Sequence, residues 1–239
     1  MAIRAVLWDI DDTLFDYGRA ERTGMRHHLA HEGLPDAYDG VEQALDRWRD
    51  LTVLHWQRFA DGECDFDGQR LARVRDFLGR PLTDDEAEEW FGRHKAHYEA
   101  AWELFPDALP ALDGLAAGYR HAVLSNSAFD HQDRKLRALG VRDRFEVLLC
   151  AAELGVAKPE AAAFHAACDA LGLPPGEVAY VGNEPDIDAR GATEAGLMGI
   201  WLDRGGSGGR PDLTRITGLG ELAAMLRPDT RFGAVSLIG

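Results

Sequence analysis

Near its N-terminus the chain reads Ile3-Arg4-Ala5-Val6-Leu7-Trp8 and then Asp9-Ile10-Asp11-Asp12-Thr13, and this stretch decides the fold. The apolar run of strand-forming residues predicts a buried β-strand. Asp9 and Asp11 follow it at positions i and i+2, which lie on one face of an extended chain. Like charges this close raise each other's pKa unless a cation or hydrogen bonds offset them. The pair therefore indicates a metal-assisted nucleophile and a proton shuttle at the carboxyl end of the strand.

Two other interpretations of this acidic stretch compete with the catalytic one. A calcium loop of the EF-hand type needs Gly at its sixth position and Glu at its twelfth. Leu14 and Ala20 stand at these positions, and a strand rather than a helix precedes them, so this interpretation fails. A solvated acidic turn stays open at this point, because Asp is common in turns.

The composition is that of an ordinary globular protein, with 46% hydrophobic and 28% charged residues among 239. A chain of this length forms one large domain, or a core domain that carries an insertion. No run approaches the ~18 apolar residues that span a bilayer. No cationic segment with a cleavage site precedes the first strand, so no secretory signal is visible. We therefore expect a cytoplasmic protein.

The net charge of −15 limits the expected partners. An acidic surface repels nucleic acid and anionic membranes, so neither is expected to bind. A phosphorylated small molecule is also anionic, and local cations must attract it. Only three of the 26 basic residues are lysines. A Lys in a structured turn therefore indicates a place where a compact ammonium group is needed.

Cysteine and histidine give little indication of a metal centre. The three cysteines lack CxxC spacing, so we expect reduced structural thiols rather than a disulfide or a zinc site; they are Cys64, Cys150 and Cys168. The nine histidines lack HExxH spacing. Three of them cluster on one expected helix, where we expect a solvated face: His27, His28 and His31.

From Thr13 to Glu103 the pattern is helical. Helices are expected over 18–32, 40–61, 67–78 and 84–103. The last begins with Thr83-x-x-Glu86, which is a capping box. Four of the six tryptophans lie in this block, and we expect them to form its core; they are Trp48, Trp56, Trp90 and Trp102.

From Phe105 onward strands and helices alternate. Strands are expected at 121–124, 145–149, 178–181 and 199–202. Helices are expected at 129–139, 160–171, 186–196 and 218–226, with the Gly-rich segment Gly205–Pro211 as a flexible connection. This alternation predicts an α/β fold, a doubly wound parallel sheet of the Rossmann-like kind with helices on both faces.

The helical block interrupts this sheet directly after its first strand. We expect a catalytic core formed by 1–15 and 104–239 and an all-α cap formed by 16–103. Ligands of such sheets bind beyond the carboxyl ends of the strands, near a topological switch point. The insertion would therefore overhang the site as a lid, with Gly18 and Pro106 as hinges.

Three further strand ends carry groups suited to phosphate chemistry. The strand at 121–124 leads into Ser125-Asn126, which offers a hydroxyl and backbone amides to an oxyanion. Lys158 lies at a helix N-terminus, where its ammonium group and the helix dipole both favour an anion. The segment Gly182–Asp188 is rich in oxygen ligands for a hard cation.

In their order along the chain, these stretches resemble motifs I to IV of the haloacid dehalogenase superfamily of hydrolases. The motifs are DxDxT, a strand ending in Ser or Thr, a Lys before a helix, and an acidic loop. The resemblance covers nearly the whole chain, and the insertion resembles the cap of members whose cap lies between motifs I and II. It implies an Mg²⁺-dependent phosphatase that works through an aspartyl-phosphate.

The resemblance also implies roles for the motif residues. Asp9 would be the nucleophile, and Asp11 would protonate the leaving alkoxide and then activate water. Thr13 would support the motif I turn. The phosphate-binding residues would be Ser125, Asn126 and Lys158. Mg²⁺ would bind the Asp9 carboxylate, the main-chain carbonyl of Asp11, and the motif IV residues Asn183 and Asp188.

Motif IV departs from the family pattern, because Asn183 stands where an Asp usually follows the Gly. An amide carbonyl can ligate Mg²⁺ but brings no charge, so we expect weaker metal binding. Glu184 and Asp186 are possible substitute ligands, whereas Asp188 matches the second acidic residue of the family pattern.

Several functions stay open at this stage. A phosphomutase shares all four motifs, whereas Asp11 disfavours a dehalogenase, which needs no proton donor for an alkoxide. A regulatory pseudoenzyme that has lost its metal is indicated only by Asn183. The expected substrate is a small phosphorylated metabolite whose identity, like the oligomeric state, the sequence does not reveal.

Overall fold

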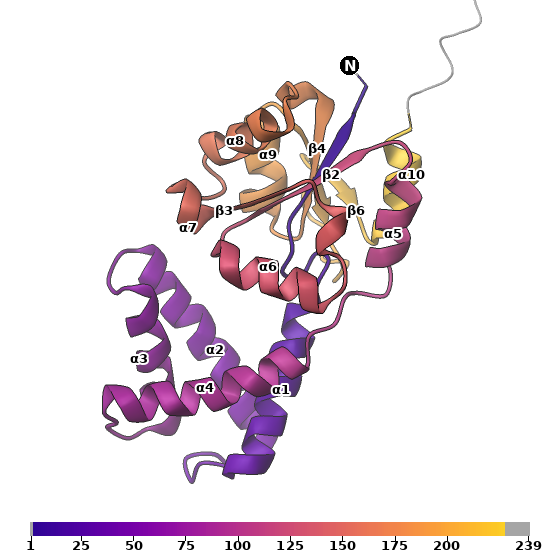
Figure 1. Cartoon of the computed structure of the whole chain (residues 1–239). Helices are drawn as coiled ribbons and strands as arrows, with labels where there is room; N and C mark the ends of the chain where they lie inside the picture. The colour runs from indigo at the N-terminus through magenta and orange to yellow at the C-terminus, as the bar shows by residue number, and fades with distance from the viewer. Residues whose placement is uncertain (1, 228–239) are drawn as a thin grey trace, which may run out of the picture. The chain divides into compact units, whose positions relative to one another are not determined.

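The computed structural model describes residues 2–227, and Figure 1 shows the whole chain. The chain divides into two compact units. One combines the residues up to Asp16 with those from Glu103 onward, and the other comprises Tyr17–Trp102. Within residues 2–227, no helix has the length and apolar character that crossing a bilayer requires.

The first unit is built on a six-stranded sheet in the order β3-β2-β1-β4-β5-β6. Its strands are β1 (Ala5–Trp8), β2 (Arg120–Ser125), β3 (Val147–Cys150), β4 (Val178–Gly182), β5 (Met198–Leu202) and β6 (Thr214–Ile216). All five pairings are parallel, which confirms the expected doubly wound α/β fold. The chain runs outward from β1 to β3 and then crosses back to β4. The topological switch point therefore lies between β1 and β4, where ligands of such sheets bind.

Both faces of the sheet are covered. All four residues of β1 are buried, and successive side chains of a strand point to opposite faces. Ala5 and Leu7 share a core cluster with Phe164 and Leu171 of α8 (Ala161–Leu171). In Figure 1, α8 and α9 (Gly191–Glu194) lie on one side of the strands, and α5 (Ala108–Leu115) and α10 (Leu222–Met225) lie on the other.

The remaining helices of this unit differ in part from the sequence prediction. α6 (Phe129–Ala138) occupies the range expected for it, whereas α5, the short α7 (Ala151–Leu154) and the edge strand β6 were not predicted. The helix expected at 186–196 is a π-helical turn, Pro185–Arg190, followed by α9. The helix expected at 218–226 begins as a 3₁₀ turn and continues as α10.

The second unit contains the four expected helices: α1 (Tyr17–Glu32), α2 (Val41–Ala60), α3 (Phe66–Leu78) and α4 (Asp84–Ala100). The capping box at the start of α4 is present, since Thr83 Oγ1 accepts from the Glu86 amide at 3.3 Å and Glu86 Oε2 accepts from the Thr83 amide at 2.8 Å. α1 and α4 cross closely at Gly24, because a Cβ there would lie 2.5 Å from the Tyr98 Cα.

The core of the helical unit confirms the sequence prediction only in part. Trp48 and Trp90 lie in it, together with Phe77 and Met25. Trp56, in contrast, is 37% exposed.

The predicted solvated histidine face is wrong for one of its three members. His28 is completely buried, and its ring packs edge-on against Trp90 at 4.3 Å between centroids. His27 and His31 are exposed as expected. The reason is the close α1–α4 crossing, which covers the side of α1 that carries His28.

The Gly-rich segment after β5 is fastened rather than a flexible connection. The Asp203 carboxylate accepts hydrogen bonds from the amides of Ser207 and Gly208, at 3.0 and 2.8 Å. Burial disfavours the charge of Asp203, but these bonds and Arg215 outweigh it and lower the pKa to about 2. Arg210 binds Asp186 at 2.7 Å, which ties the segment to the π-helical turn.

Candidate active site

Motif I lies at the switch point because β1 ends there. The Asp9 amide donates to the Val181 carbonyl at 2.9 Å, which continues the pairing of β1 with β4 past Trp8. The chain then turns sharply, with the amides of Thr13 and Leu14 both bonded to the Ile10 carbonyl. Asp12 has a φ of 57°, a left-handed conformation that Asp tolerates better than most residues. The turn brings Thr13 back toward Asp9.

Both carboxylate oxygens of Asp9 have partners from the protein. Lys158 Nζ lies 2.8 Å from Oδ1, and Thr13 Oγ1 donates to Oδ2 at 3.0 Å. Asp9 is only 7% exposed and Thr13 is fully buried. The side chain of Asp9 is therefore held in one orientation by Lys158 and Thr13. The role of Thr13 in supporting the motif I turn stays a prediction.

Lys158 joins motif I to motif IV. Its ammonium group also donates to Asp188 Oδ1 at 2.7 Å and to the Tyr180 hydroxyl at 2.6 Å. With Asp9, the group therefore has three hydrogen-bond acceptors. Burial disfavours the charged form, but Asp9 and Asp188 outweigh burial and raise the pKa of Lys158 well above its usual range. Lys158 is therefore a permanent cation at the site.

Tyr180 is a site residue that sequence reasoning missed. Its hydroxyl lies within hydrogen-bond distance of Lys158 Nζ, Asp188 Oδ1 and the Leu124 carbonyl. The sequence signal was a single phenol in an otherwise aliphatic strand, β4. Burial raises the pKa of Tyr180 well above 10, so the hydroxyl stays neutral and orients its charged neighbours.

Motif IV folds back under β4 because of Gly182. A Cβ at this position would lie 2.3 Å from Asp188 Oδ2, so only glycine allows the approach. The Glu184 amide donates to Asp188 Oδ2 at 2.9 Å, and the π-helical turn carries Asp188 inward, where it is 1% exposed. Both Asp188 oxygens thus have protein partners, and Asp188 positions Lys158.

Asn183, the departure from the family pattern, lies beside motif I. Its Oδ1 is 3.3 Å from Thr13 Oγ1, and Trp201 Nε1 donates to its main-chain carbonyl at 3.0 Å. The neighbouring Glu184 is partly open to solvent. Burial of the rest of its side chain raises its pKa, and the negative charges of Asp188 and Asp12 raise it further.

The charge of this cluster fits a divalent cation. Burial, followed by the charges of Asp188 and Asp11, raises the pKa of Asp9 from 3.8 to about 7, although Lys158 opposes this. Lys158 pairs with both Asp9 and Asp188, so two buried carboxylates share one ammonium group. When both carboxylates are ionised, their negative charge exceeds the positive charge of Lys158. Within residues 2–227, no three His, Cys, Asp or Glu side chains are grouped as a metal site. A metal here would need the mixed set that the motifs imply, with an amide and a main-chain carbonyl among its ligands.

The motif II residues face the same end of the sheet. Ser125 ends β2 and is buried. The Asn126 amide group clamps the main chain of Lys158, donating to its carbonyl and accepting from its N–H, each at 2.8 Å. The side chain of Asn126 therefore holds the segment that carries Lys158, and its binding of phosphate stays a prediction.

Asp11 turns toward α6 rather than toward Lys158. Gln132 Nε2 donates to its Oδ2 at 2.8 Å, and Lys135 Nζ forms an ion pair with its Oδ1. Burial disfavours the charge of Asp11, but Lys135 outweighs it and lowers the pKa of Asp11 below its ordinary value. Sequence reasoning missed both partners, although Lys135 is one of only three lysines.

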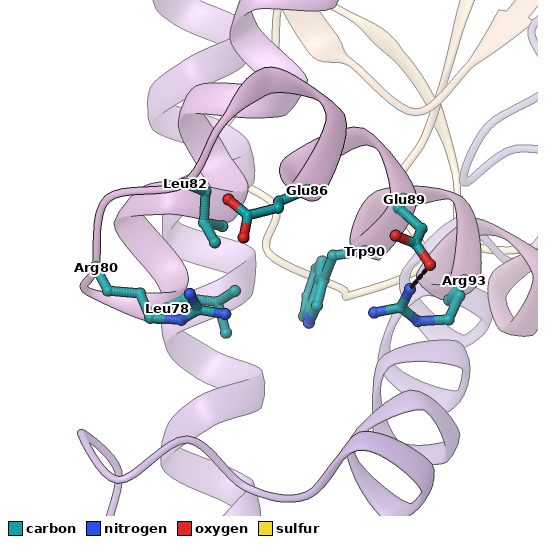
Figure 2. Close-up of a pocket in the computed structure, with 7 residues that line it drawn as sticks. All are labelled: Leu78, Arg80, Leu82, Glu86, Glu89, Trp90 and Arg93. Atoms are coloured by element: carbon teal, nitrogen blue, oxygen red, sulfur yellow. Dashed lines mark ion pairs between the residues drawn. The ribbon is translucent and has the colours of Figure 1, made fainter.

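The helical unit contains a small pocket of its own. It has a volume of about 140 Å³, and Figure 2 shows its lining by Leu78, Arg80, Leu82, Glu86, Glu89, Trp90 and Arg93. Glu89 and Arg93 pair with each other at 3.0 Å in its wall. None of the predicted site residues lines it.

Known proteins are similar to this chain along most of its length. The chain is 29% identical over 209 residues to the glyceraldehyde 3-phosphate phosphatase of Methanopyrus kandleri, covering 85% of each protein. It is 36% identical over 128 residues to the phosphoserine phosphatase of Thermus thermophilus, a match that spans 53% of this chain and only half the length of that relative. A crystal structure of the hydrolase YfnB from Bacillus subtilis, bound to magnesium, has the same fold with a TM-score of 0.79 at 20% identity, covering 95% of this chain and 100% of that one.

The sequence pattern of one family extends over all four motifs. The match covers residues 3–196, which begin just before β1 and end just after α9. The chain therefore belongs to the haloacid dehalogenase-like hydrolases, and it is an enzyme of that family.

Proposed function

We propose that this hydrolase is an Mg²⁺-dependent phosphomonoesterase that forms an aspartyl-phosphate on Asp9. The observation that carries the proposal is the arrangement around Asp9, a buried carboxylate fixed by Thr13 and by the Lys158 ammonium at 2.8 Å. A second carboxylate, Asp11, lies two residues away and has its own cation. This supplies one group to attack phosphorus and another to move a proton.

The proposed reaction has two steps. In the first, an Asp9 carboxylate oxygen forms a bond to phosphorus while the bond to the ester oxygen breaks. Asp11, which takes up a proton from solvent when the anionic phosphate group binds beside it, gives that proton to the departing alkoxide. In the second, Asp11 takes a proton from water as the water oxygen attacks phosphorus, which releases phosphate and restores Asp9. Lys158 offsets the negative charge on the phosphoryl oxygens, and the Ser125 hydroxyl donates a hydrogen bond to one of them.

The residues that would hold Mg²⁺ are the Asp9 carboxylate, the main-chain carbonyl of Asp11, Asn183 or Glu184, and Asp188. The cation would neutralise charge and align the phosphoryl group with Asp9. The excess of buried carboxylates over Lys158 supports this assignment.

A small phosphorylated metabolite is the proposed substrate class. Relatives of this chain are named for phosphoserine and for glyceraldehyde 3-phosphate, which are both small phosphomonoesters. We further propose that the helical unit Tyr17–Trp102 is a mobile cap that closes over the site. Closure would exclude bulk water around Asp9 and strengthen the electrostatic interactions there.

The test is turnover of p-nitrophenyl phosphate and a panel of phosphorylated metabolites by the purified protein. We expect hydrolysis that requires Mg²⁺, is lost on chelation, and is abolished in Asp9→Asn. Transfer of the phosphoryl group to a second sugar phosphate instead of water would identify a phosphomutase. Binding of phosphate without turnover at any Mg²⁺ concentration would identify the pseudoenzyme that Asn183 leaves open, and would overturn the proposal.

A further inference from the structure

Two buried side chains of α6 hold the Asp11 carboxylate from its two sides. Gln132 Nε2 donates to Oδ2 at 2.8 Å, and Lys135 Nζ pairs with Oδ1. Gln132 is fully buried and Lys135 is 1% exposed, whereas the Asp11 side chain is 36% exposed. Positions i and i+3 share one face of a helix, so both donors point the same way. One donor on each oxygen fixes the rotation of the carboxylate as well as its position.

The same two side chains connect Asp11 to its surroundings. Gln132 Nε2 also lies 3.1 Å from the Ser125 hydroxyl oxygen at the end of β2. Lys135 Nζ lies 4.4 Å from the centre of the Phe15 ring, which is buried just after the motif I turn. Gln132 thereby fixes the position of Asp11, which moves the proton, relative to Ser125, which is proposed to bind the phosphoryl oxygens.

Stability alone is a poor account of this pair. A buried ion pair is often matched or exceeded in stability by apolar side chains of the same volume. Gln132 Oε1 is buried and has no hydrogen-bond partner among the described residues, which costs free energy. Leu136, on the same helix, supplies apolar burial.

The geometry points to Gln132 and Lys135 as positioning residues that orient Asp11 for proton transfer to the leaving group. This inference rests on the proposed phosphatase function and deepens it. The two residues act through Asp11 and do not themselves contact the reacting atoms. A misplacement of about 1 Å can cost as much as 10²-fold in rate, so orientation of the proton donor matters.

The leaving group distinguishes positioning from a structural role. Phenolate is a poorer leaving group than p-nitrophenolate and depends more on a proton donor, although the two phosphate esters have nearly the same shape. Misorientation of Asp11 should therefore lower kcat/KM more for phenyl phosphate than for p-nitrophenyl phosphate. General damage to the fold would lower both values by the same factor.

The experiment compares Lys135→Met and Gln132→Met with the wild type on these two substrates. Each variant keeps the length of the side chain and removes the donor. We expect kcat/KM to fall at least about tenfold more for phenyl phosphate, within the total of about 10²–10⁴ that a general acid supplies. Arg137→Met, which removes an exposed cation of α6 that pairs with Asp133, is the matched control and should leave both values unchanged.

A double variant places the effect on Asp11. In the Asp11→Asn background, Lys135→Met should produce no further difference between the two substrates, because the proton donor is already absent. An equal loss on both substrates, no loss, or the same selective loss in the Asp11→Asn background would overturn the inference.

These results are separable from a failure of the proposed function. If the wild type hydrolyses neither ester, or if Asp9→Asn retains full activity, then the phosphatase proposal fails and the inference fails with it. If Lys135→Met does not fold, Gln132→Met alone decides, because it removes no charge.

Discussion

Asp9→Asn is expected to stabilise the metal-free protein at neutral pH while it abolishes turnover. Burial, with the charges of Asp188 and Asp11, raises the pKa of Asp9 from 3.8 to about 7. A carboxyl with a raised pKa binds its proton more tightly in the folded state. The stability it contributes is therefore fully present below pH 4 and is lost as the pH rises to 7. The complete loss in the free energy of unfolding corresponds to about 4 kcal/mol. Asn avoids this loss because it does not ionise.

Comparison of the variant with the wild type isolates this contribution. Burial lowers the pKa of His28 to about 4 and of His94 to about 3, so these groups change stability in the opposite direction over an overlapping pH range. Both proteins carry these histidines, and the difference between their free energies of unfolding cancels them. The measurement is urea unfolding of both proteins in a chelator between pH 4 and pH 7.5.

The variant should gain stability relative to the wild type as the pH rises, by about 4 kcal/mol over this range. Mg²⁺ at pH 7.5 should reduce the gain, because a cation that binds beside Asp9 stabilises the wild-type carboxylate. A difference that does not change with pH would refute the account of Asp9 as a buried carboxylate short of counter-charge. A gain that Mg²⁺ leaves untouched would refute the metal site.

Three further predictions test motif IV and the helical unit. Asn183→Asp should lower the Mg²⁺ concentration for half-maximal activity, because it adds a negative charge to the site. If Glu184 is the ligand instead, Glu184→Gln should raise that concentration, and Asn183→Asp should change it little. No response from either variant would contradict the assignment of motif IV. Gly182→Ala should destabilise the core by about 1–3 kcal/mol in urea unfolding, because its Cβ would lie 2.3 Å from Asp188 Oδ2; an unchanged unfolding midpoint would show that Asp188 moves freely. His28 is buried and its pKa is lowered to about 4, so its neutral form is stable above pH 6.5 and stability is lost as the pH falls toward 4. Unfolding of His28→Leu should therefore depend less on pH in this range, by up to about 3 kcal/mol, and an unaltered pH dependence would contradict the burial of this ring.

The sequence predicted the elements whose pattern is local. The helices of the second unit repeat their large apolar residues at helical spacing, and α4 begins with a capping box. β1 and β4 are continuous apolar runs that are buried throughout. Local sequence signals therefore located these elements. β6 was missed because it has three residues, two of them exposed. The π-helical turn was missed, and its Asp188 packs beneath Gly182, a contact that the pattern of the turn itself does not indicate.

The candidate site shows the same division. The four motifs were visible, since each joins a strand end to a characteristic residue. The partners supplied by other elements were not visible: Tyr180 for Lys158, and Gln132 with Lys135 for Asp11. The segment Gly205–Pro211 was misjudged for a related reason. Glycine content indicates flexibility only when no neighbouring side chain fastens the backbone, and here Asp203 does so.

The segments that lead into and out of the helical unit limit where the proposed cap can pivot. They pair with each other, since the Phe105 amide donates to the Leu14 carbonyl at 2.9 Å and the Asp16 amide donates to the Glu103 carbonyl at 3.0 Å.

Arg204 fastens the same segments to the core. It donates to the Thr13 carbonyl at 2.8 Å, pairs with Asp107 at 2.9 Å, and stacks over the Phe105 ring at 3.8 Å. Pro106 is therefore held on both sides, whereas Gly18 lies in the first turn of α1, beyond the paired segments. The hinge role of both residues stays a prediction. We expect a moving cap to bend beyond this pairing, near the first turn of α1 on one segment and between Ala100 and Glu103 on the other. Motion about that axis would leave Asp9, Asp11 and Thr13 fixed, because the paired segments and Arg204 belong to the core.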